Sequence, residues 1–167
     1  HRALLQWALE REGQLRPSVV GTEGQVYPEH RGSRSLHIRS QLGPWKDMIL
    51  NRLRASLPML FQGAGLRPFE VSRYELELVV YQDGARFGRH VDTMRVGAMD
   101  ESDRLLTGVY YFHSQPRAYS GGPLRLYRFG QSCDRPDDYV EIEPEQNSLL
   151  VFPSWASHEV RTVRCPS

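Results

Sequence analysis

Residues 104–128 read RLLTGVYYFHSQPRAYSGGPLRLYR, and this stretch decides the fold. Two runs with the composition of β-strands, residues 104–113 and 123–128, flank a segment rich in Ser, Pro and Gly, which favours a turn. Such runs recur at nearly regular spacing, at residues 69–81, 86–92, 104–113, 123–128, 139–142, 148–152 and 158–163. Seven short strands so spaced predict a sandwich or barrel and argue against alternating β–α units.

The first third of the chain has a different pattern. Apolar residues at helical spacing predict a short amphipathic helix over residues 3–11 and a second helix that begins near Pro44. Pro58 should kink this second helix or end its first part. Residues 13–43 are rich in Gly, Pro, Ser and Arg and accommodate at most two short strands, near 24–27 and 35–39. Two helices that cover one face of the strands predict a mainly β domain of the α+β class.

Composition limits the possible functions. The chain has 167 residues, of which 40% are hydrophobic and 25% charged, as in a globular protein of one domain. It contains no run of about 18 apolar residues, so we expect no membrane-spanning helix. The net charge of +1 argues against a nucleic-acid-binding protein. Cys133 and Cys165 lack the spacing of a metal site and are typical of free thiols in a cytoplasmic protein, with a single disulfide as the alternative.

The tripeptide His90-Val91-Asp92 is the first candidate for chemistry. Side chains two residues apart in a strand point to the same face, so the imidazole and the carboxylate would converge. These two ligand types suit a divalent first-row metal. The pattern is common by chance, and a surface histidine beside an acid is the simpler interpretation of the tripeptide alone.

His158 is the best candidate for a third ligand. It follows an apolar strand and the Pro153-Ser154 turn, and it opens the strand expected at residues 158–163. Several hairpins separate it from His90 and could bring the two histidines together across a barrel. Two histidines and one carboxylate leave three positions of a six-coordinate metal open, which is the arrangement of non-haem Fe(II) oxygenases. The same ligands could hold zinc or manganese without redox chemistry, so they leave the function open.

The residues around these candidates resemble one family in several separate blocks. Residues 81–92, YQDGARFGRHVD, are similar to the Y-x-x-G…H-x-D motif of the prolyl 4-hydroxylase-like 2-oxoglutarate/Fe(II) dioxygenases. Residues 104–112 and 120–127 resemble the next core strand and the G-G-x-L strand of that family. The closing blocks of the family are matched by residues 142–144, 149–154 and 158–160. The blocks follow the order of the family, whereas residues 1–68 contain no motif.

The resemblance implies a double-stranded β-helix, or jelly-roll barrel, in residues 69–167, with residues 1–68 as a helical and irregular support region of the same single domain. It also assigns the Fe(II) ligands, which would be His90, Asp92 and His158. Tyr81 would reach toward the co-substrate 2-oxoglutarate, and Tyr111 would hydrogen-bond the distal carboxylate of that molecule. For each tyrosine, packing in the core with a satisfied hydroxyl is the alternative.

One feature of the family lacks a clear counterpart in this sequence. In the family, a basic residue on the strand after the distal histidine pairs with the distal carboxylate of 2-oxoglutarate, and a guanidinium can do so with two hydrogen bonds. That position lies about nine or more residues past the histidine, and this sequence ends at Ser167. We expect the natural chain to continue beyond Ser167 and to carry the anchor and the last strand of the barrel there. Arg164, which would share strand parity with His158, is the substitute within the chain.

Together these features predict hydroxylation of an unactivated C–H bond, with O2 and 2-oxoglutarate as co-substrates and ascorbate as a candidate reductant. The expected substrate is a prolyl residue of a peptide or a small molecule resembling an amino acid. Asp92 favours hydroxylation, because related halogenases leave the carboxylate position vacant for chloride. A non-catalytic jelly-roll module that binds a metal or ligand is the alternative, and the near-neutral charge disfavours a nucleic-acid demethylase. Residues 93–103 predict a lid over the substrate or a solvated connector.

Overall fold

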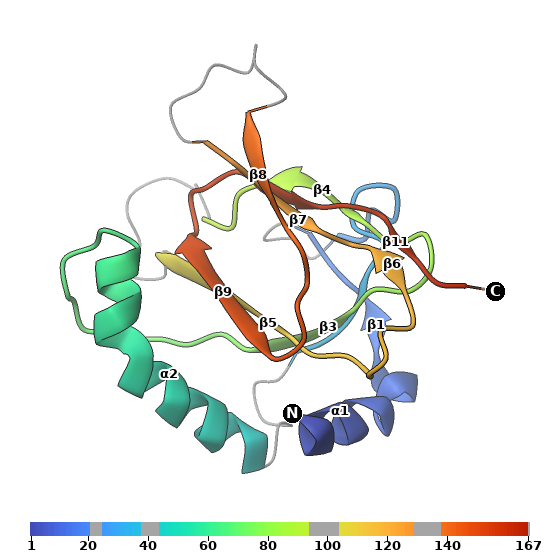
Figure 1. Ribbon diagram of the computed structural model, residues 1–167, viewed down its shortest axis with the longest axis horizontal. Helices are drawn as coiled ribbons and strands as arrows, with labels where there is room; N and C mark the ends of the chain where they lie inside the picture. Colours follow the sequence, from blue (N-terminus) through green and yellow to red (C-terminus); the bar gives the residue numbers. More distant parts are fainter. Residues whose placement is uncertain (21–24, 38–43, 94–103, 129–137, 167) are drawn as a thin grey trace.

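Two α-helices lie in the N-terminal part of the computed structural model, which describes residues 1–20, 25–37, 44–93, 104–128 and 138–166 (Figure 1). Helix α1 spans Arg2–Leu9 and buries Leu4 and Ala8, which lie four residues apart and therefore share a helix face. A 3₁₀ turn, η1, follows at Glu12–Gln14.

Helix α2 spans Pro44–Gly63. Proline is tolerated in its first turn because the N–H groups there have no partner within the helix. Pro58 lies inside α2, so the expectation that it ends the first part of the helix is wrong. Leu50 before the proline and Phe61 after it are both buried, and this packing holds the two halves although Pro58 removes one backbone hydrogen bond.

The first sheet is formed by β1 (Arg16–Pro17), β2 (Arg34–His37) and β3 (Glu77–Val80), antiparallel in that order. The strand predicted at residues 69–81 is therefore much shorter than expected. Within the described residues, β2 pairs with β3 at four positions, and residues 69–76 have no strand partner there. The strand expected at residues 24–27 is also wrong for its described part, where Gln25 forms only an isolated bridge to Val20.

The second sheet contains β4 (Phe87–His90), β10 (His158–Val160), β7 (Leu124–Tyr127) and β8 (Tyr139–Ile142), in that spatial order. All neighbouring strands in it are antiparallel. Strands far apart in the chain thus become neighbours, and the ladder pairs His158 directly with His90. This crossover brings the two candidate ligands together.

Two further antiparallel pairs complete the strands: β5 (Leu106–Tyr111) with β9 (Ser148–Pro153), and β6 (Ser120–Gly121) with β11 (Val163–Arg164). The single strand predicted at residues 158–163 is in fact two strands, because β10 ends at Val160 and the chain then turns to pair with β6. On the partner strand β6, position 121 requires glycine, since its φ is +68° and a Cβ there would lie 2.3 Å from the Thr162 carbonyl oxygen.

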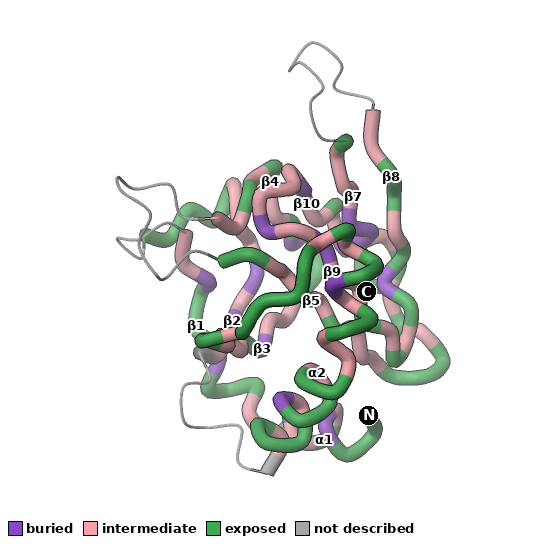
Figure 2. The backbone as a smooth tube through the Cα atoms, turned by 90° about the vertical axis from the view of Figure 1, so that its left-hand side faces the viewer, coloured by how far each residue is buried: buried purple, intermediate pink, exposed green. Residues whose placement is uncertain are grey.

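Both helices lie on one side of the strands, as the two views agree (Figures 1 and 2). The core beneath them contains buried Ala8, Leu15 and Leu78, with partly buried Trp7, Leu36, Trp45, Leu76, Val80 and Phe112 packed against it. A mostly antiparallel set of strands with two helices confirms the α+β, mainly β class. Among the described residues, no helix has the length and apolar character needed to cross a membrane.

Candidate metal centre

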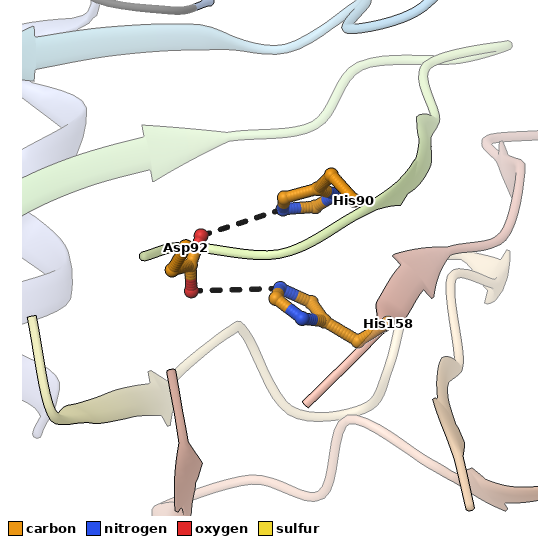
Figure 3. A group of neighbouring side chains, drawn as sticks. All are labelled: His90, Asp92 and His158. Carbon is orange, nitrogen blue, oxygen red and sulfur yellow. Dashed lines mark ion pairs between the residues drawn. The ribbon is translucent and has the colours of Figure 1, made fainter. Parts of the chain in front are cut away.

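Three ligand-type side chains meet where β4 and β10 lie side by side (Figure 3). His90 is the last residue of β4, and His158 is the first residue of β10. One ligand atom from each of His90, Asp92 and His158 lies within 4.8 Å of the other two. His158 is only 4% exposed, and the other two are half-buried. The structure therefore brings together the three residues that the sequence predicts as metal ligands.

Asp92 is held in a way that the sequence did not predict. β4 ends at His90, so Asp92 lies beyond the strand and the argument from a shared strand face does not apply to it. Its backbone N–H instead donates to the Ser154 carbonyl at 2.9 Å. The hydroxyl of Thr107 on β5 donates to Asp92 Oδ2 at 2.6 Å and lies 3.0 Å from Ser154 Oγ. Two other parts of the chain thus orient this carboxylate.

Each imidazole is fixed by a backbone carbonyl two residues before it. His90 Nδ1 lies 2.7 Å from the Gly88 oxygen, and His158 Nδ1 lies 2.9 Å from the Ala156 oxygen. A carbonyl oxygen only accepts hydrogen bonds, so each Nδ1 must carry the proton and donate it. In this tautomer the Nε2 atom is the one that offers a lone pair to a metal.

The distances between the donor atoms suit a single metal ion. His90 Nε2 lies 3.5 Å from Asp92 Oδ1, and His158 Nε2 lies 3.6 Å from Asp92 Oδ2. Neighbouring ligands of an octahedral ion with bonds of about 2.1 Å are about 3 Å apart, so small side-chain shifts would bring all three donors onto one ion. Two imidazoles and one carboxylate suit Fe(II) and leave coordination positions open. The donor set therefore fits the iron that the resemblance implies.

The electrostatic surroundings favour the metal-binding protonation states. Burial alone would raise the pKa of Asp92, but hydrogen bonds from His90 and Thr107 and the charges of the two histidines lower it to about 2. Burial lowers the pKa of His158, and the neighbouring His90 lowers it further. At neutral pH the site therefore offers a carboxylate and, at His158, a neutral imidazole.

Aromatic rings pack against both imidazoles. Phe87 stacks on His90 with 3.6 Å between ring centroids, and Phe152, which is 2% exposed, meets the His158 ring edge-on at 4.7 Å. The two imidazole centroids are 4.2 Å apart. This packing restricts rotation of the ligands and lines the centre with apolar surface.

Of the two tyrosines predicted to contact 2-oxoglutarate, Tyr81 is influenced by Asp92 and Tyr111 is a neighbour of Tyr81. Burial raises the pKa of Tyr81 to about 12, and the charge of Asp92 contributes to the increase. Burial also raises the pKa of Tyr111, and the neighbouring Tyr81 and Tyr119 raise it further. Tyr111 is thus close enough to Tyr81 and to Tyr119 for each of them to affect its pKa. Tyr81 and Tyr111 keep their protons at neutral pH and can donate hydrogen bonds, as a bound carboxylate requires.

Arg164 lies on a different strand from His158. It is exposed on β11, where it pairs with Ser120 of β6. Because β10 and β11 are separate strands, the parity argument that connected Arg164 with His158 does not hold. Its side chain lines an open groove of about 380 Å³ that is formed by Arg117, Ala118, Tyr119, Ser120, Arg164, Cys165 and Pro166.

The residues that support the ligands were missed by the sequence reasoning. Thr107 shares a strand face with Tyr111, and this parity is the one signal that could have found it. Ser154 is fully buried behind Asp92, but as a turn residue it gave no signal. Tyr119 directly precedes strand β6 and belongs to no sequence motif that would single it out. Of the predicted lid at residues 93–103, only Thr93 is among the described residues.

Comparison with known sequences gives one consistent family. Residues 76–167 match the family described as the 2OG-Fe(II) oxygenase superfamily. An uncharacterized PKHD-type hydroxylase from Synechocystis sp. is 37% identical over 123 residues, which cover 72% of this chain and 40% of the relative. A PKHD-type hydroxylase from Gloeothece citriformis is 29% identical over 164 residues, which cover 97% of this chain and 64% of the relative. The chain thus spans less than two thirds of the length of either relative.

Solved structures show the same similarity. A prolyl-4-hydroxylase from Pseudomonas putida superposes with a TM-score of 0.65 at 25% identity, covering 97% of this chain and 83% of that protein. A prolyl hydroxylase from Trichoplax adhaerens, solved with a peptide fragment of the hypoxia inducible factor oxygen degradation domain, gives a TM-score of 0.68 at 21% identity. It covers 98% of this chain and 72% of that protein, and it supports a jelly-roll-like fold.

Proposed function

The chain belongs to the 2OG-Fe(II) oxygenase superfamily and is prolyl 4-hydroxylase-like, and from this premise we propose that it uses Fe(II), 2-oxoglutarate and O2 to hydroxylate an unactivated C–H bond. The observation that carries the proposal is the cluster of His90, Asp92 and His158 at the meeting of β4 and β10. Both imidazoles there are held with Nε2 free, and the carboxylate is fixed from behind. A structural zinc site is closed by four protein ligands, whereas an oxygenase centre has three and keeps positions open for its co-substrates.

Each part of the centre has a task in this reaction. Fe(II) and 2-oxoglutarate, when bound, supply the activation of O2 and the oxidative decarboxylation that yields succinate and CO2. His90 and His158 would present Nε2, and Asp92 would present a carboxylate oxygen whose orientation the Thr107 hydroxyl fixes. Phe87 and Phe152 keep the two imidazoles in place and limit the entry of water. These rings would thus shield the chemistry that the bound Fe(II) and 2-oxoglutarate supply from bulk water.

We assign the co-substrate side of the site to Tyr81 and Tyr111. As neutral phenols they can donate hydrogen bonds to a carboxylate of 2-oxoglutarate, and their mutual proximity supports a shared role. Arg164 stays a prediction as the partner of the distal carboxylate, now without support from strand parity. We further propose that the strands close into a double-stranded β-helix and that residues 1–68 support it within one domain.

The substrate we propose is a prolyl residue of a peptide, with a small amino-acid-like molecule as the second option. The similarity to the Pseudomonas putida prolyl-4-hydroxylase supports the first choice. The competing function is a non-catalytic jelly-roll module that binds a metal or ligand. It would retain the three ligands but would not couple metal binding to consumption of 2-oxoglutarate.

Anaerobic titration with Fe(II) and 2-oxoglutarate tests the proposal. The visible absorption band of the chelate should appear in the wild-type chain and disappear in His90→Ala, Asp92→Ala and His158→Ala. His113→Ala is the matched control, because the His113 ring contacts Ser114 and Tyr119 and lies outside the cluster. On admission of O2, the wild type should convert 2-oxoglutarate to succinate. Metal binding without the band and without succinate would favour the non-catalytic module.

A further inference from the structure

A segment of the N-terminal region is bonded directly to the strand that carries His90. The N–H of Gly88 donates to the His30 carbonyl at 2.7 Å, and the N–H of Gly32 donates to the Arg86 carbonyl at 2.9 Å. Arg31 lies opposite Phe87 in an isolated antiparallel bridge. Residues 30–32 therefore extend the second sheet along β4, although the support region contains no family motif. The close approach requires glycine at position 88, where a Cβ would lie 2.5 Å from His30 Nδ1.

The Arg31 side chain is the most highly connected group of this segment. It is only 12% exposed. Its Nη1 donates to the Val19 carbonyl at 2.8 Å, its Nη2 to Glu77 Oε2 at 3.2 Å, and its Nε to Ser33 Oγ at 3.3 Å. All three guanidinium nitrogens are engaged, so the plane of the group is fixed. A guanidinium held in this way restricts the side chains that contact it, which are Phe87 and Ser33.

The first group that packs against Arg31 is Phe87. The guanidinium carbon lies 4.8 Å from the centroid of the Phe87 ring, within the range of a cation–π interaction. The same ring stacks on His90 at 3.6 Å. Arg31, Phe87 and His90 thus form a continuous series of contacts. Movement of the guanidinium would release the phenyl ring, which together with the Gly88 carbonyl restricts rotation of the imidazole about its Cβ–Cγ bond.

The second group is Ser33, which is 2% exposed. Its hydroxyl donates to Ser18 Oγ at 3.0 Å, and its proximity lowers the pKa of the Tyr81 phenol against the larger effect of burial. Because a guanidinium can only donate, Arg31 forces Ser33 to accept at that contact and so orders the hydrogen bonds that follow. The Ser33 hydroxyl is thereby held in one orientation beside the Tyr81 phenol.

We propose that Arg31 is a positioning residue of the iron centre, which fixes the His90 ring through Phe87 and the Tyr81 hydroxyl through Ser33. The His90 contact concerns metal binding alone, whereas the Tyr81 contact rests on the function proposed above, because it concerns 2-oxoglutarate. A purely structural Arg31 would instead affect only the stability of the fold. The two contacts run through different intermediates, so they can be separated experimentally.

The test uses Co(II) as a spectroscopic substitute for Fe(II) in the 167-residue chain. We expect Arg31→Lys to raise the Kd for Co(II) by about tenfold, the lower end of what altered supporting contacts cost a metal site. In separate assays of 2-oxoglutarate turnover with Fe(II), the same variant should raise the KM for 2-oxoglutarate with a smaller change in kcat. Arg34→Lys is the matched control, because the Arg34 side chain donates to the Leu15 carbonyl and contacts neither Phe87 nor Ser33 among the described residues. It should leave both constants unchanged.

Two further variants separate the contacts and remain informative if Arg31→Lys does not fold. Phe87→Leu should weaken Co(II) binding and alter the Co(II) absorption spectrum, while Ser33→Ala should raise the KM for 2-oxoglutarate and leave Co(II) binding intact. Unchanged constants in these variants, with only a lowered melting temperature, would overturn the proposal and leave Arg31 a structural residue. If the wild type binds Co(II) but not 2-oxoglutarate, the proposed function fails, and the Co(II) measurements still decide whether Arg31 positions His90.

Discussion

Replacement of Thr107 by valine removes one hydroxyl group from the support of Asp92 and keeps the shape of the side chain. The hydroxyl donates to Asp92 Oδ2 at 2.6 Å and lies 3.0 Å from Ser154 Oγ. A hydrogen bond to a charged group contributes about 1.5–3 kcal/mol. If the carboxylate loses that much orientation energy for the metal, the Kd should rise by about 10- to 140-fold, since about 1.4 kcal/mol corresponds to a factor of ten.

The loss has two further effects in the structure. The Thr107 hydroxyl bonds to Oδ2 and so holds the carboxylate in one orientation, and valine would leave the carboxylate free to rotate. Ser154 is 0% exposed and would lose its contact with the Thr107 hydroxyl, which should also lower the free energy of unfolding by about 1–3 kcal/mol. The pKa of Asp92 should rise, because the bond from Thr107 is one of the causes that lower it.

Titration of the apo protein with Co(II) at neutral pH measures the first effect, and urea unfolding measures the second. Thr162→Val is the control, since the Thr162 hydroxyl makes no hydrogen bond with any described residue. Thr107→Ser should restore most of the affinity by returning the donor. A Thr107→Val variant that binds Co(II) within twofold of the wild type would refute the role assigned to this hydroxyl.

Three other perturbations follow from the same structure. Because burial lowers the pKa of His158, this residue is unprotonated at pH 7. Its protonation should therefore weaken Mn(II) binding only as the pH falls below the ordinary histidine pKa of about 6.5. If a titration of Mn(II) affinity against pH shows a loss from His158 that begins above pH 7, the prediction is wrong. Gly121→Ala should lower the free energy of unfolding by at least ~1–2 kcal/mol, because φ there is +68° and the Cβ would meet the Thr162 carbonyl. Gly63→Ala, which has open space around it, should not lower this free energy, and urea denaturation compares the two variants. Phe152→Ala should cost about 3–5 kcal/mol in the same assay, since the ring is almost fully buried, and it should also weaken Co(II) binding by loosening the His158 ring; full Co(II) affinity would show that Phe152 serves only the core.

The sequence predicted the metal ligands better than it predicted their surroundings. His90 and His158 could be found because each borders a short run with strand composition, and the ladder between β4 and β10 then pairs them directly. Asp92 was found for a reason that does not hold, because the strand ends before it and Ser154 positions its backbone. A two-residue spacing thus identified the residue but not the contact that orients it.

The remaining errors have a common physical cause. The strand expected at residues 69–81 is paired only at Glu77–Val80 within the described residues, and the strand expected at residues 158–163 was divided by a change of partner from β7 to β6. Arg31 had no periodicity or motif to single it out, since its contacts exist only because residues 30–32 lie along β4. Local composition shows that a segment can form a strand, while pairing between distant segments decides its length and its neighbours.

The two bonds from imidazole Nδ1 to a carbonyl two residues earlier have a consequence for the kinetics of metal uptake. Gly88 and Ala156 each belong to the same short segment as the histidine that they orient, so ring tautomer and direction are set by local backbone before any ion arrives. An incoming ion then meets two rings that need neither exchange a proton between their nitrogens nor turn over. Association should accordingly be limited by release of water from the ion, and the slow step of loading should depend on the identity of the metal more than on the protein.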